Sequence, residues 1–134
     1  PAVVAVVCDS FPDATIRTDV VSDDFDALVE SLSDGFLSDL VITTGGTGFG
    51  SRDITPEATA HVCQREAPGV AEFLRMKSLE QTPQAILSRA YAGIAGKTLF
   101  VNTPGSSRGA KFCTEMLMPV IPHALRMLED ASHK

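Results

Sequence analysis

The chain of 134 residues is poor in aromatic side chains, with seven Phe, one Tyr and no Trp. So few rings do not supply the platform on which a single-stranded nucleic acid stacks several bases. Positive charge is also scarce, because 11 Lys and Arg residues are outnumbered by 17 Asp and Glu residues, for a formal net charge of −6. Nucleic-acid-binding domains concentrate basic residues on one face. We therefore expect no nucleic-acid partner.

Long apolar runs are absent as well. No stretch approaches the length of about 20 apolar residues that spans a bilayer, so we expect no membrane segment. The first residues lack the basic segment that opens a secretory signal peptide. Three cysteines, Cys8, Cys63 and Cys113, are scattered without the spacing of a zinc site. Unpaired thiols are typical of a reducing compartment, which favours a cytoplasmic protein.

The most informative segment is the glycine-rich run over residues 43–49 (TTGGTGF). An apolar stretch at residues 40–42 precedes it, and Pro56 after it suits the first turn of a helix. This order predicts a strand, a tight turn and a helix. The three glycines of the run allow positive φ and a close approach of a ligand to the backbone. The N–H groups of such a turn, with the positive end of the next helix, suit a phosphate or another anion.

Predicted strands and helices alternate along the chain. The strands are expected at residues 3–7, 15–21, 40–44, 91–95 and 98–102, and the helices near residues 22–34, 56–67, 70–77, 83–89, 106–117 and 122–130. This alternation predicts an α/β fold, a three-layer sandwich with a mostly parallel central sheet. A chain of this length predicts one domain, which covers residues 1–134.

The first two predicted strands lie too close together for that architecture. A parallel crossover needs roughly a dozen residues or more, whereas only residues 8–14 separate the strands at 3–7 and 15–21. Either the two strands are not parallel neighbours, or residues are missing from the sequence between Ser10 and Phe11. We expect the second, a missing loop and helix at that point.

The motifs from residue 43 onward carry a family resemblance. Residues 43–59 (TTGGTGFGSRDITPEAT) resemble the signature of the molybdenum-cofactor biosynthesis family, the molybdopterin-binding domain of molybdopterin adenylyltransferases and of the N-terminal part of gephyrin. The match continues through residues 65–69 (REAPG), 87–89 (LSR), 96–98 (GKT), 102–106 (NTPGS) and 119–125 (PVIPHAL). These motifs are long and ordered as in the family, so the resemblance implies its α/β fold.

The N-terminal part departs from the family. Residues 8–10 (CDS) are similar to the Ser-Asp ending of its first strand, and residues 21–23 (VSD) to its Val-Pro-Asp at a helix start. The acidic loop and first helix that lie between these motifs in the family are absent. That absence agrees with the missing residues expected above, and it leaves one catalytic acidic residue of the family without a counterpart.

The resemblance implies adenylyl transfer. In that reaction the terminal phosphate of molybdopterin attacks the α-phosphate of ATP and releases pyrophosphate. It also implies Mg²⁺, a homotrimer, and Asp53 as a catalytic and metal-binding carboxylate. Asp9 follows a predicted central strand, where open α/β sheets bind ligands, so we expect it to be the second catalytic and metal-binding carboxylate. Mg²⁺ prefers such oxygen ligands.

The resemblance further assigns the substrate-binding residues, which are Ser10, Asp23, Thr44, Gly45, Gly46, Thr47, Gly48, Asn102, Pro104, Gly105, Ser106 and Ser107. Structural alternatives stay open for several of these positions. The glycines also fit an ordinary turn, and Asp53 also fits an Asx-turn or a helix cap. Asp9 also fits a plain turn, while Asp23 and Ser106 are also explained as helix N-caps.

Other functions remain open beside the enzyme. A carrier or scaffold that binds molybdopterin without catalysis would explain the absent acidic loop. The related domain of the molybdate-insertion proteins is disfavoured because those proteins carry further domains. The competence-damage type of enzyme, which acts on nicotinamide nucleotides, is disfavoured because its motif differs after the two glycines.

Overall fold

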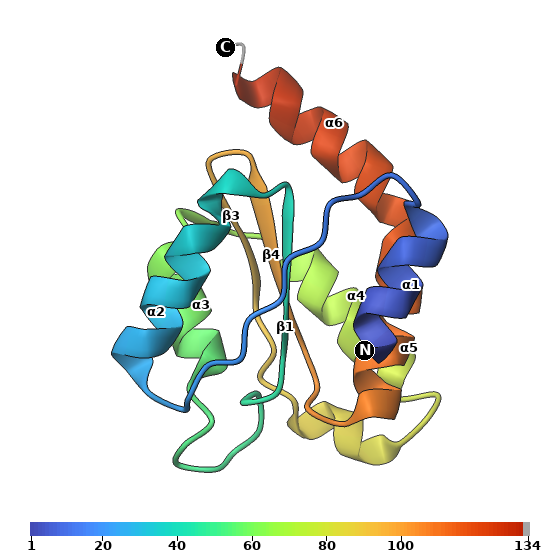
Figure 1. Cartoon of the computed structure of the whole chain (residues 1–134). Helices are drawn as coiled ribbons and strands as arrows, with labels where there is room; N and C mark the ends of the chain where they lie inside the picture. The colour runs from blue at the N-terminus through green and yellow to red at the C-terminus, as the bar shows by residue number, and fades with distance from the viewer. Residues whose placement is uncertain (133–134) are drawn as a thin grey trace.

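A four-stranded sheet runs through the middle of the molecule in the order β1-β4-β3-β2 (Figure 1). The strands of this computed structural model, which describes residues 1–132, are β1 Leu40–Thr44, β2 Arg65–Glu66, β3 Ala92–Ala95 and β4 Thr98–Thr103. β1 and β4 are parallel, while β4 with β3 and β3 with β2 are antiparallel. The expectation of a mostly parallel sheet was therefore wrong, because a two-residue turn joins β3 to β4 and such a turn can connect only antiparallel strands.

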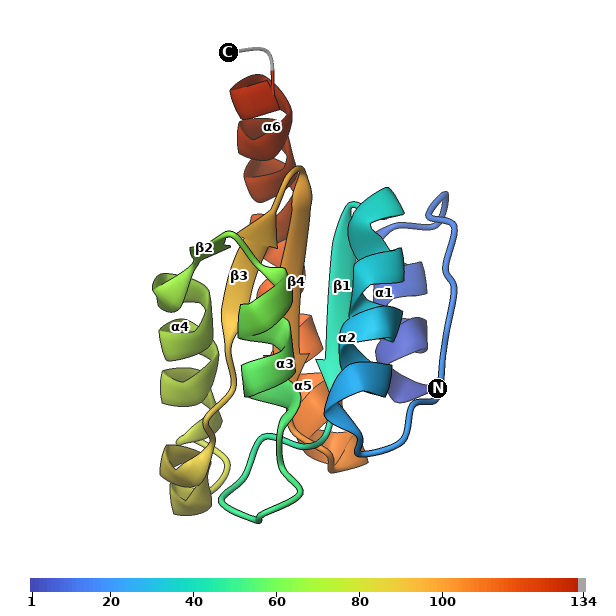
Figure 2. The same cartoon turned by 90° about the vertical axis from the view of Figure 1, so that its left-hand side faces the viewer.

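Helices cover both faces of the sheet, which confirms the α/β class (Figures 1 and 2). On one face lie α2 and α3, and on the other lie α1, α4 and α5, while α6 extends beyond the end of the sheet. The helices are α1 Ala2–Ser10, α2 Phe25–Asp34, α3 Thr55–Val62, α4 Pro68–Ser78, α5 Ser107–Leu117 and α6 Ile121–Ser132, with short 3₁₀ turns at Gly35–Leu37 (η1), Pro83–Leu87 (η2) and Met118–Val120 (η3). No helix within residues 1–132 is both long enough and apolar enough to cross a bilayer.

β4 is the centre of the fold, and all six of its residues are buried. Successive strand residues face opposite sides of a sheet, so Phe100 joins the core under α2 and α3 while Val101 joins the core under α1, α4 and α5. Both side chains are fully buried. The ends of β4 and of its parallel neighbour β1 are thereby held rigidly at one edge of the sheet.

The N-terminal apolar run is a helix rather than the predicted strand at residues 3–7. Val6 of α1 is buried in the core beside α5, and Val7 packs against the same cluster. An apolar run of this length fits a buried helix as well as a buried strand, and packing on α5 decides between them. β-branched residues oppose a helix only slightly.

The second predicted strand, at residues 15–21, is also absent from the sheet. This segment is extended and mostly exposed, with Val20 99% exposed. The chain passes directly from α1 into it, since the N–H of Phe11 donates to the carbonyl of Val7 at 2.8 Å. The argument for residues missing between Ser10 and Phe11 relied on two adjacent strands, so it no longer applies.

Candidate active site

Two loops meet where the parallel strands β1 and β4 end. The glycine loop (residues 45–54) follows Thr44, and the proline loop (residues 104–106) follows Thr103. The N–H of Gly45 donates to the carbonyl of Thr103 at 3.0 Å. A Cβ built on Gly105 would lie 3.3 Å from the Cα of Gly45, so the two loops touch backbone to backbone. Ligands of open α/β sheets bind at this edge, outside the carboxyl ends of the strands.

The turn in the glycine loop depends on two residues with positive φ. Gly45 has φ +91° and Gly46 has φ +70°, a region that glycine adopts without strain. The carbonyl of Gly46 accepts the N–H of Thr55 at 3.2 Å, which attaches the turn to the start of α3. A side chain on Gly46 would collide with the Thr55 hydroxyl. The glycine is therefore required by both the backbone conformation and the neighbouring helix.

Both loops leave main-chain donors free. Within residues 1–132, the N–H groups of residues 46–49 in the glycine loop and of residues 105–108 around the start of α5 donate to no acceptor. The second set adds the positive end of the α5 dipole. We expect two groups of free donors on adjoining loops to suit an anion, and one with several oxygens in particular, and we call these donors the anion receptor.

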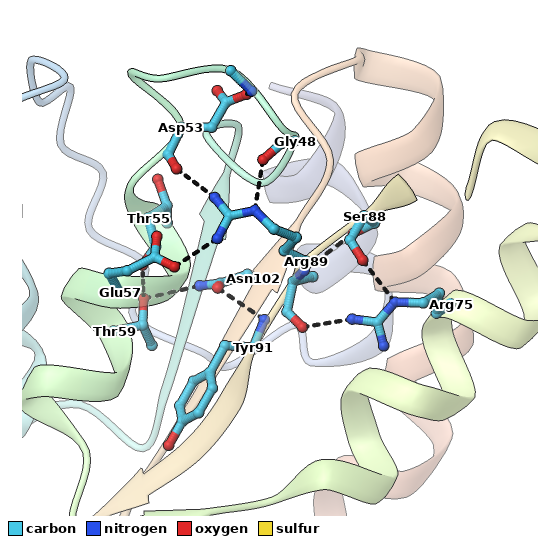
Figure 3. Close-up of polar contacts among 12 residues, drawn as sticks. Gly48, Asp53, Thr55, Glu57, Thr59, Arg75, Ser88, Arg89, Tyr91 and Asn102 are labelled. Carbon is cyan, nitrogen blue, oxygen red and sulfur yellow. Dashed lines mark hydrogen bonds and ion pairs between the residues drawn. The ribbon is translucent and has the colours of Figure 1, made fainter. Parts of the chain in front are cut away.

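Arg89 holds the glycine loop in place by hydrogen bonds to its carbonyl groups (Figure 3). Its Nε donates to the carbonyl of Gly48 at 2.7 Å, and a terminal nitrogen donates to the carbonyl of Asp53. The other terminal nitrogen makes a 2.6 Å ion pair with Glu57 Oε2. The main-chain N–H of Arg89 donates to the carbonyl of Thr47 at 2.8 Å. Arg89 was missed as a site residue, and the Leu-Ser-Arg motif at residues 87–89 was the available signal.

Asn102 lies under the glycine loop and is bound by protein atoms on several sides. Its side chain is 2% exposed. Its Oδ1 accepts the N–H of Tyr91 at 3.0 Å, and its Nδ2 donates to the hydroxyl of Thr59 at 3.0 Å (Figure 3). The same Nδ2 donates to the hydroxyl of Thr43 at 2.8 Å. Protein atoms already use the polar groups of this side chain, which favours a structural role, and a contact of Asn102 with substrate stays a prediction. Asn102 joins β1, β4, α3 and Tyr91, the residue before β3, below the site.

A family model described as "Probable molybdopterin binding domain" matches residues 5–123. The chain belongs to this family. It is 46% identical over 113 residues to the molybdopterin adenylyltransferase of Helicobacter pylori strain 26695, covering 82% of this chain and 64% of that protein. The chain thus spans less than two thirds of the length of that relative.

Further relatives agree with this assignment. This molybdopterin-binding domain is 37% identical over 114 residues to the molybdenum cofactor biosynthesis protein B of Bacillus subtilis, covering 81% of this chain and 67% of that protein. The solved structure of the molybdopterin biosynthesis enzyme MoaB from Thermus thermophilus superposes with a TM-score of 0.85 at 40% identity. The superposition covers 99% of this chain and 83% of that one.

The start of α5 in this molybdopterin-binding domain carries both expected serines. Ser106 is the N-cap, and its Oγ accepts the N–H of Gly109 at 3.0 Å, so the capping alternative holds for its side chain. Ser107 is the first helical residue and is exposed. Arg108 and Lys111 follow within the first two turns and add positive charge near the free N–H groups.

A groove of about 390 Å³ adjoins the two loops in the molybdopterin-binding domain. Its lining comes from the glycine loop, from the segment between α4 and η2, and from the start of α5; it includes Thr47, Phe49, Gln81, Thr82, Gln84 and Ser106. Among residues 1–132, no Asp, Glu, Lys or Arg lines this groove. Its polar groups are amides and hydroxyls, so the groove suits an uncharged heterocycle beside the anion receptor.

Asp53 closes the glycine loop on itself. Its Oδ2 accepts the N–H of Gly50 at 2.9 Å, and a Cβ on Gly48 or Gly50 would lie 2.9 Å from this oxygen. This bond runs back three residues, so it is not an Asx-turn, which bonds the backbone two residues on. Asp53 is not the cap of α3 either, because the N-cap of that helix is Ile54. The same carboxylate lies in the loop that carries the free donors, so the bond to Gly50 does not exclude a role toward a ligand.

The other acidic residues lie elsewhere. Asp9 and Ser10 are the last residues of α1, and this end of the helix lies at the opposite end of the sheet from the glycine loop (Figure 1). The expectation that Asp9 follows a central strand was wrong, because residues 3–7 form no strand. Asp23 lies just before α2, whose N-terminal end is on the side of the glycine loop (Figures 1 and 2). The N-cap of α2 is Asp24, whose Oδ2 accepts the N–H of Ala27 at 3.0 Å.

The three cysteines of the molybdopterin-binding domain differ in their exposure to solvent. Burial raises the pKa of Cys63 to about 11, and burial also raises the pKa of Cys113, against a smaller lowering by its contact with Ser78. Cys8 is exposed. Because the thiolate is the reactive form, we expect a thiol reagent at pH 8 to label Cys8 quickly and the other two slowly. Rapid labelling of two or three thiols in the folded protein would contradict this.

Proposed function

We propose that this domain transfers AMP from ATP to the terminal phosphate of molybdopterin. A bond forms between a terminal phosphate oxygen of molybdopterin and the α-phosphorus of ATP, and the bond from that phosphorus to the bridging oxygen of the β-phosphate breaks. Pyrophosphate leaves. The observation that carries the proposal is the pair of loops with free N–H groups at the ends of two parallel strands, in a chain 46% identical to a molybdopterin adenylyltransferase.

The reaction joins two anions, so it depends mainly on charge stabilisation and positioning. The free N–H groups of residues 46–49 and 105–108 would hold phosphate oxygens, and the dipole of α5 adds to their field. The uncharged groove between Phe49 and Gln84 would take the heterocycle of a substrate. Such a site needs no protein nucleophile, because the pterin phosphate is itself the nucleophile.

The structure does not bring together the two carboxylates expected to bind a metal. Within residues 1–132 no three His, Cys, Asp or Glu side chains gather as a metal site. Asp9 and Asp53 lie at opposite ends of the sheet, so they cannot share an ion. Mg²⁺ often binds through substrate phosphates and one or two carboxylates. A Mg²⁺ ion at this site would be held by substrate phosphates and by Asp53 alone of the expected pair, and a titration of turnover with Mg²⁺ tests its requirement.

A carrier that binds molybdopterin without catalysis is the second candidate. The separation of the two expected carboxylates favours it, because only Asp53 of that pair lies at the anion receptor. A titration of the full-length protein distinguishes the two functions. Molybdopterin is added first, then ATP with Mg²⁺, and pyrophosphate release is followed. Tight pterin binding with release supports the enzyme, and tight binding without release supports the carrier.

Following the family resemblance, we also propose a homotrimer in the cytoplasm. Exposed apolar side chains on α4, at its C-cap and on η2 are available for contact between copies. They include Met76, Leu79 and Ile86, which are 65%, 44% and 68% exposed. Sedimentation equilibrium of the full-length protein tests the trimer, and a monomer at micromolar concentration would contradict it.

We expect Asp53→Asn to keep the fold and the affinity for molybdopterin while lowering turnover strongly. The asparagine oxygen can still accept the N–H of Gly50, so the glycine loop stays closed. Only the negative charge beside the reacting phosphates is lost. Thermal unfolding, pterin binding and pyrophosphate release measure the three effects. Unchanged turnover would reject a catalytic role for this carboxylate.

A further inference from the structure

Arg89 donates hydrogen bonds to three carbonyl oxygens of the glycine loop. The carbonyls of Gly48 and Asp53 accept hydrogen bonds from its guanidinium (Figure 3). The carbonyl of Thr47 accepts a hydrogen bond from its main-chain N–H. We propose that Arg89 is a positioning residue that makes this loop an anion receptor by turning its carbonyls away from the ligand. The inference rests on the anion receptor of the proposed function, and it does not depend on adenylyl transfer taking place there.

Each of two carbonyls bound by Arg89 belongs to the same planar peptide unit as an N–H group that has no partner in the described part of the chain. In a trans peptide the C=O and the N–H of one unit point in opposite directions. Because the carbonyl of Thr47 points toward Arg89, the N–H of Gly48 in the same peptide unit points away from Arg89. The same holds for the carbonyl of Gly48 and the N–H of Phe49. These N–H groups are among the donors without a partner in residues 1–132.

A glycine-rich loop needs such an anchor because its peptide units turn easily. Glycine populates positive and negative φ about equally, so an unanchored loop would present carbonyl oxygens as often as N–H groups. A carbonyl oxygen facing the site would repel a phosphate. The guanidinium of Arg89 also places a positive charge behind the donors, where it adds to their attraction for an anion.

The structure holds Arg89 itself in place. Arg75 of α4 donates to the carbonyls of Ser88 and Ala90, on either side of it, at 2.9 and 2.8 Å (Figure 3). Glu57 of α3 pairs with its guanidinium. That pair is partly exposed, with side chains 34% and 52% exposed, and such pairs contribute little to stability. The arrangement therefore fixes loop geometry more than it stabilises the fold.

The shape of the side chain matters as much as its charge. A guanidinium presents five N–H donors in a rigid plane, whereas a lysine ammonium is a point charge with three donors on a flexible stem. Arg89 uses three different nitrogens for Gly48, Asp53 and Glu57. Arg89→Lys keeps the positive charge and loses the rigid planar set of donors. Comparing this variant with the parent therefore distinguishes positioning of the loop from simple electrostatic attraction.

The test measures binding of inorganic pyrophosphate by calorimetry at fixed ionic strength. The full-length protein is compared with Arg89→Lys, Arg89→Met and the control Arg126→Met. Arg126 lies on α6, at the far end of the molecule, and its loss removes one positive charge (Figure 1). We expect both Arg89 variants to bind about tenfold to a hundredfold more weakly, and the control to bind as the parent does. Arg89→Lys binding as tightly as the parent would overturn the inference.

A second measurement needs no variant. Amide resonances of the parent protein are followed by NMR as pyrophosphate is added. We expect the N–H signals of Gly48 and Phe49 to shift with the binding curve. Binding without any shift of these two signals would overturn the inference, as would no binding at all. If pyrophosphate binds and depends on Arg89 but no AMP is transferred, the inference stands and the proposed enzyme does not.

Discussion

Gly46→Val is expected to remove anion binding and turnover and to lower the free energy of unfolding by roughly 1–3 kcal/mol. Gly46 has φ +70°, where a β-branched residue is strained. Its new Cβ would collide with the Thr55 hydroxyl, and Thr55 is only 6% exposed, so it has little room to move. The structure places the valine against Thr55 of α3, so the loop must be displaced.

Gly96→Val is the matched control for this prediction. Gly96 also has positive φ, at +58°, but a Cβ there meets nothing within 4 Å. It lies in the turn between β3 and β4, away from the glycine loop (Figure 1). We expect it to lose stability from backbone strain alone and to keep pyrophosphate affinity. Chemical denaturation and calorimetry measure both. Normal pyrophosphate binding by Gly46→Val would show that the turn is not part of the receptor.

Asn102→Leu is expected to have the largest effect on stability, roughly 2–4 kcal/mol less free energy of unfolding. The change removes the acceptor of the Tyr91 N–H and the donor to Thr43 and Thr59. A buried polar group left without a partner costs its full desolvation energy. We also expect weaker pyrophosphate binding, because Asn102 joins the strands and α3 beneath the glycine loop.

Thr114→Val provides the control for Asn102→Leu. Thr114 is fully buried, and its hydroxyl donates to the carbonyl of Ala110 within α5. A helical carbonyl keeps its main-chain partner when that hydroxyl is removed, so the cost should be about 1 kcal/mol or less. Urea denaturation compares the two variants. A similar small loss for both would contradict the central role given to Asn102.

The glycine loop could be predicted from sequence because its determinants are local. Positive φ at Gly45 and Gly46 and a proline in the first turn of α3 act within a few residues. The apolar run of α1 was misassigned because its pattern fits both a strand and a helix, and only packing on α5 decides. The two-residue strand β2 is too short to leave a sequence signal.

The candidate site was predicted in part for the same reason. The glycine loop and the start of α5 follow from turn and cap chemistry near each residue. The bond between Arg89 and Gly48 joins residues 41 positions apart, and no local rule predicts such a contact. Asp9 was misplaced because its assignment depended on the wrong strand. The structural bonds of Asn102 were not predicted, because burial cannot be read from its motif.

A crystal structure of the full-length protein with bound molybdopterin tests the central claim most directly. The account predicts that the terminal phosphate lies between the two loops, within hydrogen-bonding distance of N–H groups from residues 46–49 and from residues 105–108. It also predicts that the Arg89 guanidinium keeps its bonds to Gly48 and Asp53 in the complex. A phosphate bound at the opposite end of the sheet, or held by only one loop, would contradict the account.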